Sequence, residues 1–300
     1  MIKWFSFFLL TCCALSTLAQ STPLSYEDKK GNPHLLGNIE RSMLELPPYE
    51  EWFEMRYNQY ELEEAVIEKI NAFHTDDVKV KVYLGTWCGD SKQEVTRFLK
   101  IVDHSNIEMS AVEMIGLDNR PGKTKQGPNG EEKGLNIHRV PTFIFYKADK
   151  EIGRIVEFPM NSLEKDIAQI YAGLAPEPNY QVANYMGKLF QEKSIEQIDT
   201  FLAKNIRYFK HKSIGEHELN TLGYVLLAAR EVEKAVVVFK FNTLLYPESG
   251  NVFDSLGEAY MKAGDTQSAI ENYMRSYQLD PQNANAMQMV KEMIASKDHG

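Results

Sequence analysis

Apolar and polar positions alternate in the first strongly patterned segment of this chain. Over Val78–Leu84 the valines alternate with lysines, which is typical of a strand with one buried face. Asp90–Val102 places apolar residues at helical spacing, so a helix follows this strand. The same two patterns predict strands over 107–117, 143–146 and 152–158 and helices over 61–73 and 162–171. This order of elements predicts an α/β domain built on a mixed sheet.

Three other segments lack such a pattern. Residues 20–58 are polar and turn-rich, so we expect an irregular N-terminal arm that lies against the α/β domain. Asn119–Gly134 contains four glycines and two prolines, which predicts a long polar loop. Residues 174–178 contain two prolines and are expected to form a short, stiff linker.

The C-terminal part of the chain repeats itself with a period of 34 residues. Five positions recur at this spacing: Leu222 and Leu256, Gly223 and Gly257, Ala235 and Ala269, Phe239 and Tyr273, and Pro247 and Pro281. This period and these residue types resemble the tetratricopeptide-repeat family, whose repeats are pairs of packed helices. The resemblance implies repeats at about 216–249 and 250–283 within an all-α domain of residues 179–300.

Two repeats are fewer than the three that a stable stack usually needs. We expect a capping helix over Met287–Ile294 and a divergent helix pair over 179–190 and 195–209 to complete the stack. Such stacks present a concave surface that binds a peptide or a protein. The alternative is a scaffold that only dimerises the protein or supports the first domain. No basic cluster suited to a carboxylate terminus is present, so the type of ligand stays open.

The first residues of the chain have the composition of a secretory signal. Lys3 precedes an apolar run over Trp4–Leu15, and small residues lead up to Ala19. We therefore expect residues 1–19 to be a signal peptide and the protein to be exported, to the periplasm or the extracellular space. An uncleaved anchor helix is the alternative. No later stretch is apolar for long enough to span a bilayer.

The chain has three cysteines, Cys12, Cys13 and Cys88. The first two lie in the expected signal peptide, where lipoprotein processing is an alternative to simple secretion. After cleavage Cys88 is the single thiol, so no internal disulfide can form. A lone cysteine in an exported protein suggests a reactive thiol or pairing with another molecule. A homodimer linked through Cys88 stays open.

Cys88 stands in the segment Trp87-Cys88-Gly89-Asp90-Ser91, between the first predicted strand and the helix after it. A second segment, Val140-Pro141-Thr142, comes directly before the strand over 143–146. Together the two motifs resemble the thioredoxin family over residues 59–173. The resemblance implies an α/β thioredoxin fold, a mixed sheet with helices on both faces. It also implies a cis proline that faces the cysteine and exposes the preceding backbone to a substrate strand.

The resemblance also assigns roles to individual residues. It implies catalytic roles for Cys88, Ser91, Trp87 and Pro141, and substrate contacts for Gly89, Asp90, Val140 and Thr142. The chain departs from the family at two positions: Ser91 replaces the second cysteine, and Val82 replaces a buried carboxylate that assists proton transfer. Release of a mixed disulfide therefore needs a thiol from the substrate or from an external donor.

Elementary electrostatics describes the same site without the resemblance. A cysteine at a helix N-terminus faces unpaired backbone N–H groups and the positive end of the helix dipole, and both favour thiolate. We expect the Ser91 hydroxyl to donate a hydrogen bond to the sulfur, whereas the charge of Asp90 disfavours thiolate. His138 and Arg139 come just before Val140, and either could lie near the sulfur.

Three functions fit these motifs. The first is an exported oxidoreductase that forms mixed disulfides with client proteins through Cys88, while the repeats bind those proteins. The second is a non-catalytic protein-binding scaffold in which Cys88 is incidental. The third is a glutaredoxin-like iron–sulfur carrier. The single Gly153, where such proteins have a double glycine, and the exported compartment both argue against it.

Charge and histidine spacing exclude other classes of function. The net charge is −9, or −10 once Lys3 leaves with the signal peptide, and no basic stripe could follow nucleic-acid phosphates. The histidines have no spacing suited to a metal: His74, His104 and His138 are scattered, and His211 and His217 lack companion ligands. We therefore expect no metal and no cofactor.

Overall fold

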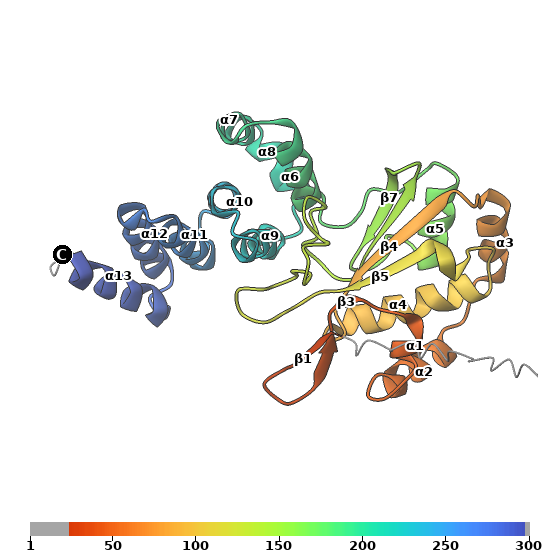
Figure 1. The fold of residues 1–300 in the computed structure, drawn as a ribbon. Coiled ribbons are helices and arrows are strands. Elements are labelled where there is room, and N and C mark those ends of the chain that lie inside the picture. The colour runs from red at the N-terminus through yellow and green to blue at the C-terminus, as the bar shows by residue number, and fades with distance from the viewer. Residues whose placement is uncertain (1–23, 298–300) are drawn as a thin grey trace, which may run out of the picture.

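The computed structural model describes residues 24–297, so the expected signal peptide at residues 1–19 lies outside the described part. The first half of this part is built on a five-stranded sheet in the order β3-β5-β4-β6-β7 (Figure 1). The strands are β3 (Gly37–Asn38), β4 (Val78–Leu84), β5 (Val112–Gly116), β6 (Thr142–Lys147) and β7 (Lys150–Val156). β4 and β5 are parallel and the other neighbouring pairs are antiparallel, so the sheet is mixed, as expected.

The alternation of residues along β4 gives the sheet two different faces. Val80, Val82 and Leu84 belong to the main hydrophobic core, whereas Tyr83 belongs to a cluster on the opposite face. Five helices add buried side chains to the main core: α1 (Arg41–Leu44), α2 (Glu50–Gln59), α3 (Glu64–Phe73), α4 (Gly89–Asp103) and α5 (Leu163–Tyr171). The main core therefore lies between one face of the sheet and this helical layer.

The opposite face of the sheet is covered in its centre by an irregular segment. Its buried cluster consists of Tyr83, Ile115, Leu117, Ile137, Val140 and Ile144. None of these residues belongs to a helix, whereas Val156 of β7, on the same face, packs with residues of the helical second half such as Val182 and Leu219. The covering segment between β5 and β6 holds Gly122, Gly130 and Gly134 at positive φ, a conformation that right-handed helices do not contain.

The N-terminal segment is more regular than its composition suggests. It forms a hairpin of β1 (Ser25–Glu27) and β2 (Pro33–Leu35), the edge strand β3, the short helix α1 (Arg41–Leu44) and helix α2. Leu44 and Phe53 are buried in the same core as β4. The expected irregular arm is therefore wrong, because this segment completes the sheet and part of its helical layer.

The second half of the described chain is entirely helical. Its helices are α6 (Gln181–Glu192), α7 (Ile195–Lys204), α8 (Ile206–Lys212), α9 (Glu216–Ala228), α10 (Val232–Leu245), α11 (Gly250–Ala263), α12 (Thr266–Leu279) and α13 (Ala284–Lys297). The pairs α9–α10 and α11–α12 coincide with the two expected repeats, and they are stacked side by side, with α13 beyond them (Figure 1). Over residues 24–297, none of the helices is both long enough and apolar enough to cross a membrane.

Two glycines explain how the helices of each repeat approach so closely. A Cβ atom placed on Gly223 would lie 2.4 Å from the ring of Phe239, and one on Gly257 would lie 3.0 Å from the ring of Tyr273. These two contacts are separated by 34 residues along the chain, so the repeat in sequence is also a repeat in packing. The small residues therefore make room for an aromatic ring at the same place in both pairs.

Candidate functional site

Cys88 lies at the junction between the strand and the helix that the sequence predicts. β4 ends at Leu84, and Cys88 is the N-cap residue of α4 with an extended backbone conformation. The thiol is half-buried, and its sulfur donates a hydrogen bond to the backbone carbonyl of Val140 at 3.3 Å. The carboxylate of Asp90 lies 3.8 Å from the same sulfur. The two sequence motifs therefore meet at this sulfur.

The loop that carries Val140 is fixed on both sides of its proline. The peptide bond between Val140 and Pro141 is cis, as the resemblance implied. The hydroxyl of Thr142 donates to the carbonyl of Arg139 at 2.8 Å, and the carbonyl of Pro141 accepts from the N–H of Glu157 at 2.7 Å. Val140 and Thr142 are buried, so the groups of this loop that the sulfur meets are backbone atoms.

Ser91 does not make its expected contact with the sulfur. Its side chain is buried, and its hydroxyl oxygen accepts a hydrogen bond from the N–H of Gly85 at 3.1 Å. A buried backbone N–H at the end of a strand needs an acceptor, and Ser91 provides it. The role of Ser91 seen in the structure is to hold the turn between β4 and α4.

Trp87 is anchored beside the cysteine. Its indole N–H donates to the carbonyl of Leu117 at 2.9 Å, which ties the turn after β4 to the end of β5. Gly89 and Asp90, the next residues of the motif, are exposed. The exposed side of the cysteine is therefore open to another molecule, while its inner side faces Trp87 and Val140.

Lys125, in the loop after β5, is a further residue of the site that was not predicted from the sequence. Two backbone hydrogen bonds close the loop on itself. The N–H of Lys125 donates to the carbonyl of Asp118 at 2.7 Å, and the N–H of Asp118 donates to the carbonyl of Gln126 at 3.0 Å. This closure brings the ammonium to 5.8 Å from the centre of the Trp87 ring. Burial lowers the pKa of Lys125, while the charges of Cys88 and Glu157 act in the opposite direction. No local pattern in the sequence signals this placement.

Arg139 connects the cysteine site to the helical half of the chain. Its guanidinium lies 3.4 Å from the carboxylate of Glu157 and 4.5 Å from the centre of the Tyr180 ring. It also donates to the hydroxyl of Thr221 at 3.0 Å and to the carbonyl of His217 at 3.3 Å, both in α9. Burial raises the pKa of Glu157, and the positive charge of Arg139 opposes this shift. The loop beside Cys88 and the first repeat are thus joined through one side chain.

His138 is a packing residue at this junction. Its ring is buried edge-on against Tyr180, and its Nδ1 lies 3.0 Å from the carbonyl of Asn136. Burial lowers the pKa of His138 to about 3, so the ring is neutral at physiological pH. Within residues 24–297 no group of three or more potential metal ligands is gathered in one place.

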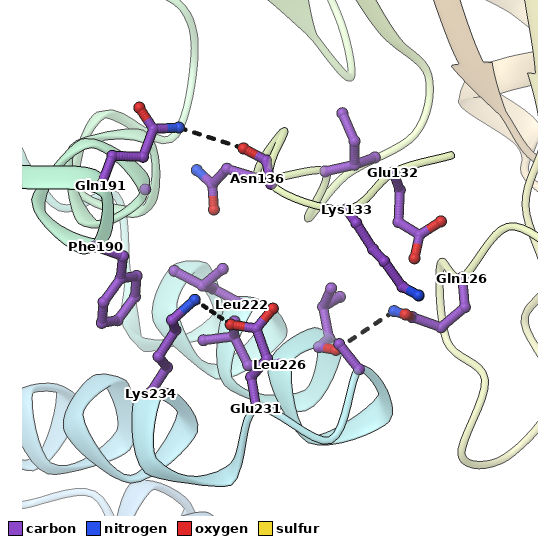
Figure 2. Close-up of a pocket in the computed structure, with 15 residues that line it drawn as sticks. Gln126, Glu132, Lys133, Asn136, Phe190, Gln191, Leu222, Leu226, Glu231 and Lys234 are labelled. Carbon is purple, nitrogen blue, oxygen red and sulfur yellow. Dashed lines mark hydrogen bonds and ion pairs between the residues drawn. The ribbon is translucent and has the colours of Figure 1, made fainter. Parts of the chain in front are cut away.

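A small cavity lies where the loop between β5 and β6 meets the helices (Figure 2). Its volume is about 100 Å³, and Figure 2 shows Leu222 and Leu226 on its floor, with Lys234 pointing toward Glu231. The side chains of Gln126 and Gln191 bridge its edges through hydrogen bonds to the carbonyls of Val225 and Gly134. Sites for small molecules are about 300 Å³ or larger, so we interpret this cavity as a gap in the packing between the two halves.

The repeats present a second candidate surface, on the side formed by α9, α11 and α13. Hydrogen bonds run across this side from each helix to the next: the hydroxyl of Tyr224 donates to the carboxylate of Glu258 at 3.1 Å, and the amide of Asn285 donates to Asp254 at 3.3 Å. These polar residues lie on one continuous face, which is the arrangement by which stacked helix pairs present a binding surface.

Comparison with known proteins supports the repeats. No family model matches the chain. Superkiller protein 3 of Schizosaccharomyces pombe is 25% identical over 141 residues, covering 46% of this chain and 10% of that protein. Protein CTR9 homolog of Arabidopsis thaliana is 30% identical over 79 residues, covering 26% of this chain and 7% of that protein. The chain thus spans a tenth or less of the length of these curated relatives. Both relatives are tetratricopeptide-repeat proteins, and this similarity fits the helical-repeat architecture of the second half.

Proposed function

We propose that this protein is a protein-binding scaffold whose tetratricopeptide repeats bind a protein partner. The observation that carries the proposal is the pair of helical repeats α9–α10 and α11–α12, with its similarity to two tetratricopeptide-repeat proteins. Repeats of this kind stack into extended surfaces that bind peptides and proteins. The connection of Arg139 to α9 fixes the first repeat to the sheet, so the scaffold acts as one body.

The sheet-containing half is proposed to be a thioredoxin-like domain over residues 59–173, joined to the helical domain by the linker at 174–178. The mixed sheet, the cysteine at the start of the helix after β4, and the cis bond before Pro141 support this assignment. The N-terminal segment belongs to the same folding unit in this proposal, because it shares the main core.

A second candidate function is thiol–disulfide exchange at Cys88. The half-buried thiol at a helix N-terminus, next to an exposed Gly89, is the observation that favours it. In this step the Cys88 thiolate attacks a client disulfide, a mixed disulfide forms, and the second client sulfur leaves as a thiolate. A thiol of the client or of an external donor then releases Cys88. In this candidate Trp87 and Pro141 shape the site, Ser91 holds the turn, and Gly89, Asp90, Val140 and Thr142 line the path of the client.

Export is part of the proposal. The charged start, apolar run and small residues of residues 1–19 support a cleaved signal peptide and a location in the periplasm or outside the cell. Mass spectrometry of the protein made with its own N-terminus in a secreting host tests this. A mature chain that begins at Gln20 is expected, and an unprocessed or lipid-modified N-terminus would contradict it.

Partner capture separates the two functions. The chain without its expected signal peptide has Cys88 as its single cysteine. This protein is incubated with a periplasmic extract, and the bound proteins are identified with and without reductant. Scaffold function predicts the same partners for wild type and Cys88→Ser. Thiol exchange predicts adducts that disappear in Cys88→Ser and under reductant. A disulfide-linked homodimer would appear as a doubled mass without reductant.

The control for the scaffold is a repeat variant, Leu256→Ala with Tyr273→Ala, which removes two large side chains from the packing of the second repeat. Loss of non-covalent partners in this variant is the expected result. Unfolding curves verify that this variant has lost the packing of the second repeat. If it nevertheless retains all partners, binding through the repeats is contradicted.

A further inference from the structure

A cavity of about 300 Å³ lies beside Trp87, between the cysteine turn and the N-terminal segment. Residues far apart in the sequence line it, among them His34 from β2, Trp52 from α2, Thr86 and Trp87 from the turn before α4, and Lys92 from the first turn of α4. We call it the Trp87 cavity. Its volume reaches the range of binding sites, whereas the gap between the two halves, at about 100 Å³, does not.

Hydrogen bonds tie the N-terminal wall of this cavity to the turn that carries the cysteine. The N–H of Leu35 donates to the hydroxyl oxygen of Thr86 at 3.1 Å. The same oxygen lies 3.4 Å from Nδ1 of His34. Both Thr86 and His34 are buried, so packing also fixes their positions. The wall is therefore held in place by the segment that ends at the cysteine.

The cation of this cavity is the ammonium of Lys92. Among the ion pairs formed within residues 24–297, none involves Lys92. The ammonium lies 5.6 Å from the centre of the Trp52 ring, which attracts it through a cation–π interaction. A ring face does not occupy the three N–H donors of a lysine, so these donors can still meet an anion.

The acidic residue of the lining, Asp28, is already bound within its own hairpin. One carboxylate oxygen accepts from the N–H groups of Lys30 and Asn32 at 2.8 and 2.9 Å, and the other accepts from the Asn32 amide at 2.9 Å. These hydrogen bonds hold the pKa of Asp28 well below its usual range. Burial lowers the pKa of His34, so this ring is neutral at physiological pH. Lys92 is therefore the charged group of the lining that remains available to a ligand.

The cavity lies next to the reactive cysteine without including it. Trp87 directly precedes Cys88, and the N–H of Lys92 donates to the carbonyl of Cys88 at 3.1 Å. The sulfur itself contacts the carbonyl of Val140, and Cys88 is not part of the cavity lining. A molecule that reacts with the sulfur can therefore place a neighbouring side chain in the cavity.

We propose that the Trp87 cavity holds an aspartate or glutamate side chain of the client protein whose disulfide Cys88 attacks. This inference rests on the proposed thiol–disulfide exchange and names its substrate class, namely disulfides that have an acidic residue nearby. The carboxylate accepts charge-assisted hydrogen bonds from the Lys92 ammonium, while its methylene groups pack against the rings of Trp52 and Trp87. Apolar walls with one placed charge are the usual design of a selective pocket.

Rates of mixed-disulfide formation with two matched peptides test the proposal. Each peptide has one cysteine activated as a disulfide with 2-thiopyridine, and the two peptides carry either glutamate or glutamine at both positions two residues from that cysteine. Attack by the Cys88 thiolate joins the peptide to Cys88 and releases 2-thiopyridone, which is measured by its absorbance. The wild type is expected to react about five-fold faster with the glutamate peptide, because one partly exposed charge pair forms.

Variants of the lysine show whether this preference comes from the cavity. Lys92→Met is expected to abolish the preference, and Lys92→Arg is expected to keep most of it. Lys123→Met is the matched control, because Lys123 is exposed and lies outside the cavity lining, and it should leave the preference unchanged. Each variant is judged by the ratio of its two rates, so a change in the reactivity of the thiol itself cancels.

Equal rates for the two peptides in the wild type, or a preference that survives Lys92→Met, would overturn the proposal. Failure of thiol exchange itself is distinguishable, because neither peptide would then release 2-thiopyridone. In that case fluorescence anisotropy with labelled peptides in which serine replaces the cysteine decides about the cavity. Tighter binding of the glutamate form that is lost in Lys92→Met supports the site, and equal binding of the two forms overturns it.

Discussion

Lys125 lies in the loop after β5, far from Cys88 along the chain, but its positive charge interacts with Cys88 in the folded protein. The lysine has no hydrogen-bonded anion among residues 24–297, and its electrostatic partners are Cys88, Glu157 and Arg139. A cation next to a thiol favours the thiolate, which is the reactive form.

Replacing this lysine tests its influence on the thiol. Lys125→Met is expected to slow alkylation of Cys88 by iodoacetamide at neutral pH about three-fold, since a partly screened charge pair is lost. Lys123→Met is the matched control, because Lys123 lies in the same loop and is exposed. Equal alkylation rates in both variants and the wild type would show that Lys125 does not act on Cys88.

His138 makes the stability of the protein depend on pH. Its pKa is about 3 in the folded chain, whereas an unfolded histidine has a pKa of about 6.5. The unfolded chain therefore binds a proton that the folded chain does not, and stability is lost as pH falls below about 6.5. Between pH 6.5 and 5 this loss is about 2 kcal/mol in the free energy of unfolding.

Urea unfolding at several pH values measures this effect. His138→Phe keeps a ring against Tyr180 and removes the titrating group, so its stability is expected to change less between pH 6.5 and 5 than that of the wild type. The exposed His211 provides the control variant His211→Phe. Parallel pH profiles for wild type and His138→Phe would contradict this role of His138.

Asp118 adds a second pH dependence. Burial raises the pKa of its carboxyl, but hydrogen bonds from Arg120 outweigh burial and lower this pKa, so the stability that Asp118 contributes is lost only at more acidic pH.

At the scale of single elements, periodicity was the most reliable guide. The strand at Val78–Leu84 has the bounds that its alternating valines predict, and α4 ends at Asp103, one residue beyond the expected Val102. The predicted helix over 195–209 is divided into α7 and α8 at Asn205, where the backbone leaves the helical conformation. β1, β2 and β3 are only two or three residues long, too short to show any period.

The two repeat glycines are expected to respond differently to the same substitution. Gly223→Ala places a methyl group within 2.4 Å of the Phe239 ring, and this overpacking should destabilise the protein by about 2 kcal/mol. Gly257→Ala meets Tyr273 at 3.0 Å, and the higher helix propensity of alanine, worth about 1 kcal/mol, should nearly offset the tighter contact.

Chemical unfolding of the two variants measures the difference. The double variant Gly223→Ala with Phe239→Leu relieves the contact and is expected to recover part of the lost stability. Equal effects of the two glycine substitutions would show that the close approach at Gly223 is not what limits the packing of the first repeat.

At the scale of the whole molecule, the two halves have separate cores but one shared site. The main core consists entirely of residues between Leu35 and Tyr171, and the helical cores take only Val156 from the sheet. The halves meet through the loop that leads to Val140, through Tyr180 and through α9. The loop beside Cys88 and the first repeat therefore meet at one junction.

Separate cores predict that the first half folds alone. A chain of residues 20–178 is expected to unfold in one cooperative transition, because every residue of its main core is retained. A shorter chain of residues 20–158 lacks α5 and should not unfold cooperatively, since Leu163, Ile167 and Ile170 are lost from that core. Circular dichroism during urea unfolding makes the comparison. A gradual transition for residues 20–178 would contradict the division into two halves.

The sequence by itself determined the features that depend on local pattern. Alternation and helical spacing predicted the mixed sheet and most of its helices, and the 34-residue period predicted the paired helices of the repeats, because these signals arise from burial on one side of a regular element. The two motifs around Cys88 and Pro141 also predicted that these distant segments meet.

Only the tertiary structure decided which side chains surround the meeting point. The partner of Ser91, the approach of Lys125 to Trp87 and the contact of Arg139 with α9 depend on how irregular loops cross the face of the sheet. Loop paths are set by long-range packing and by backbone hydrogen bonds that have no period in the sequence.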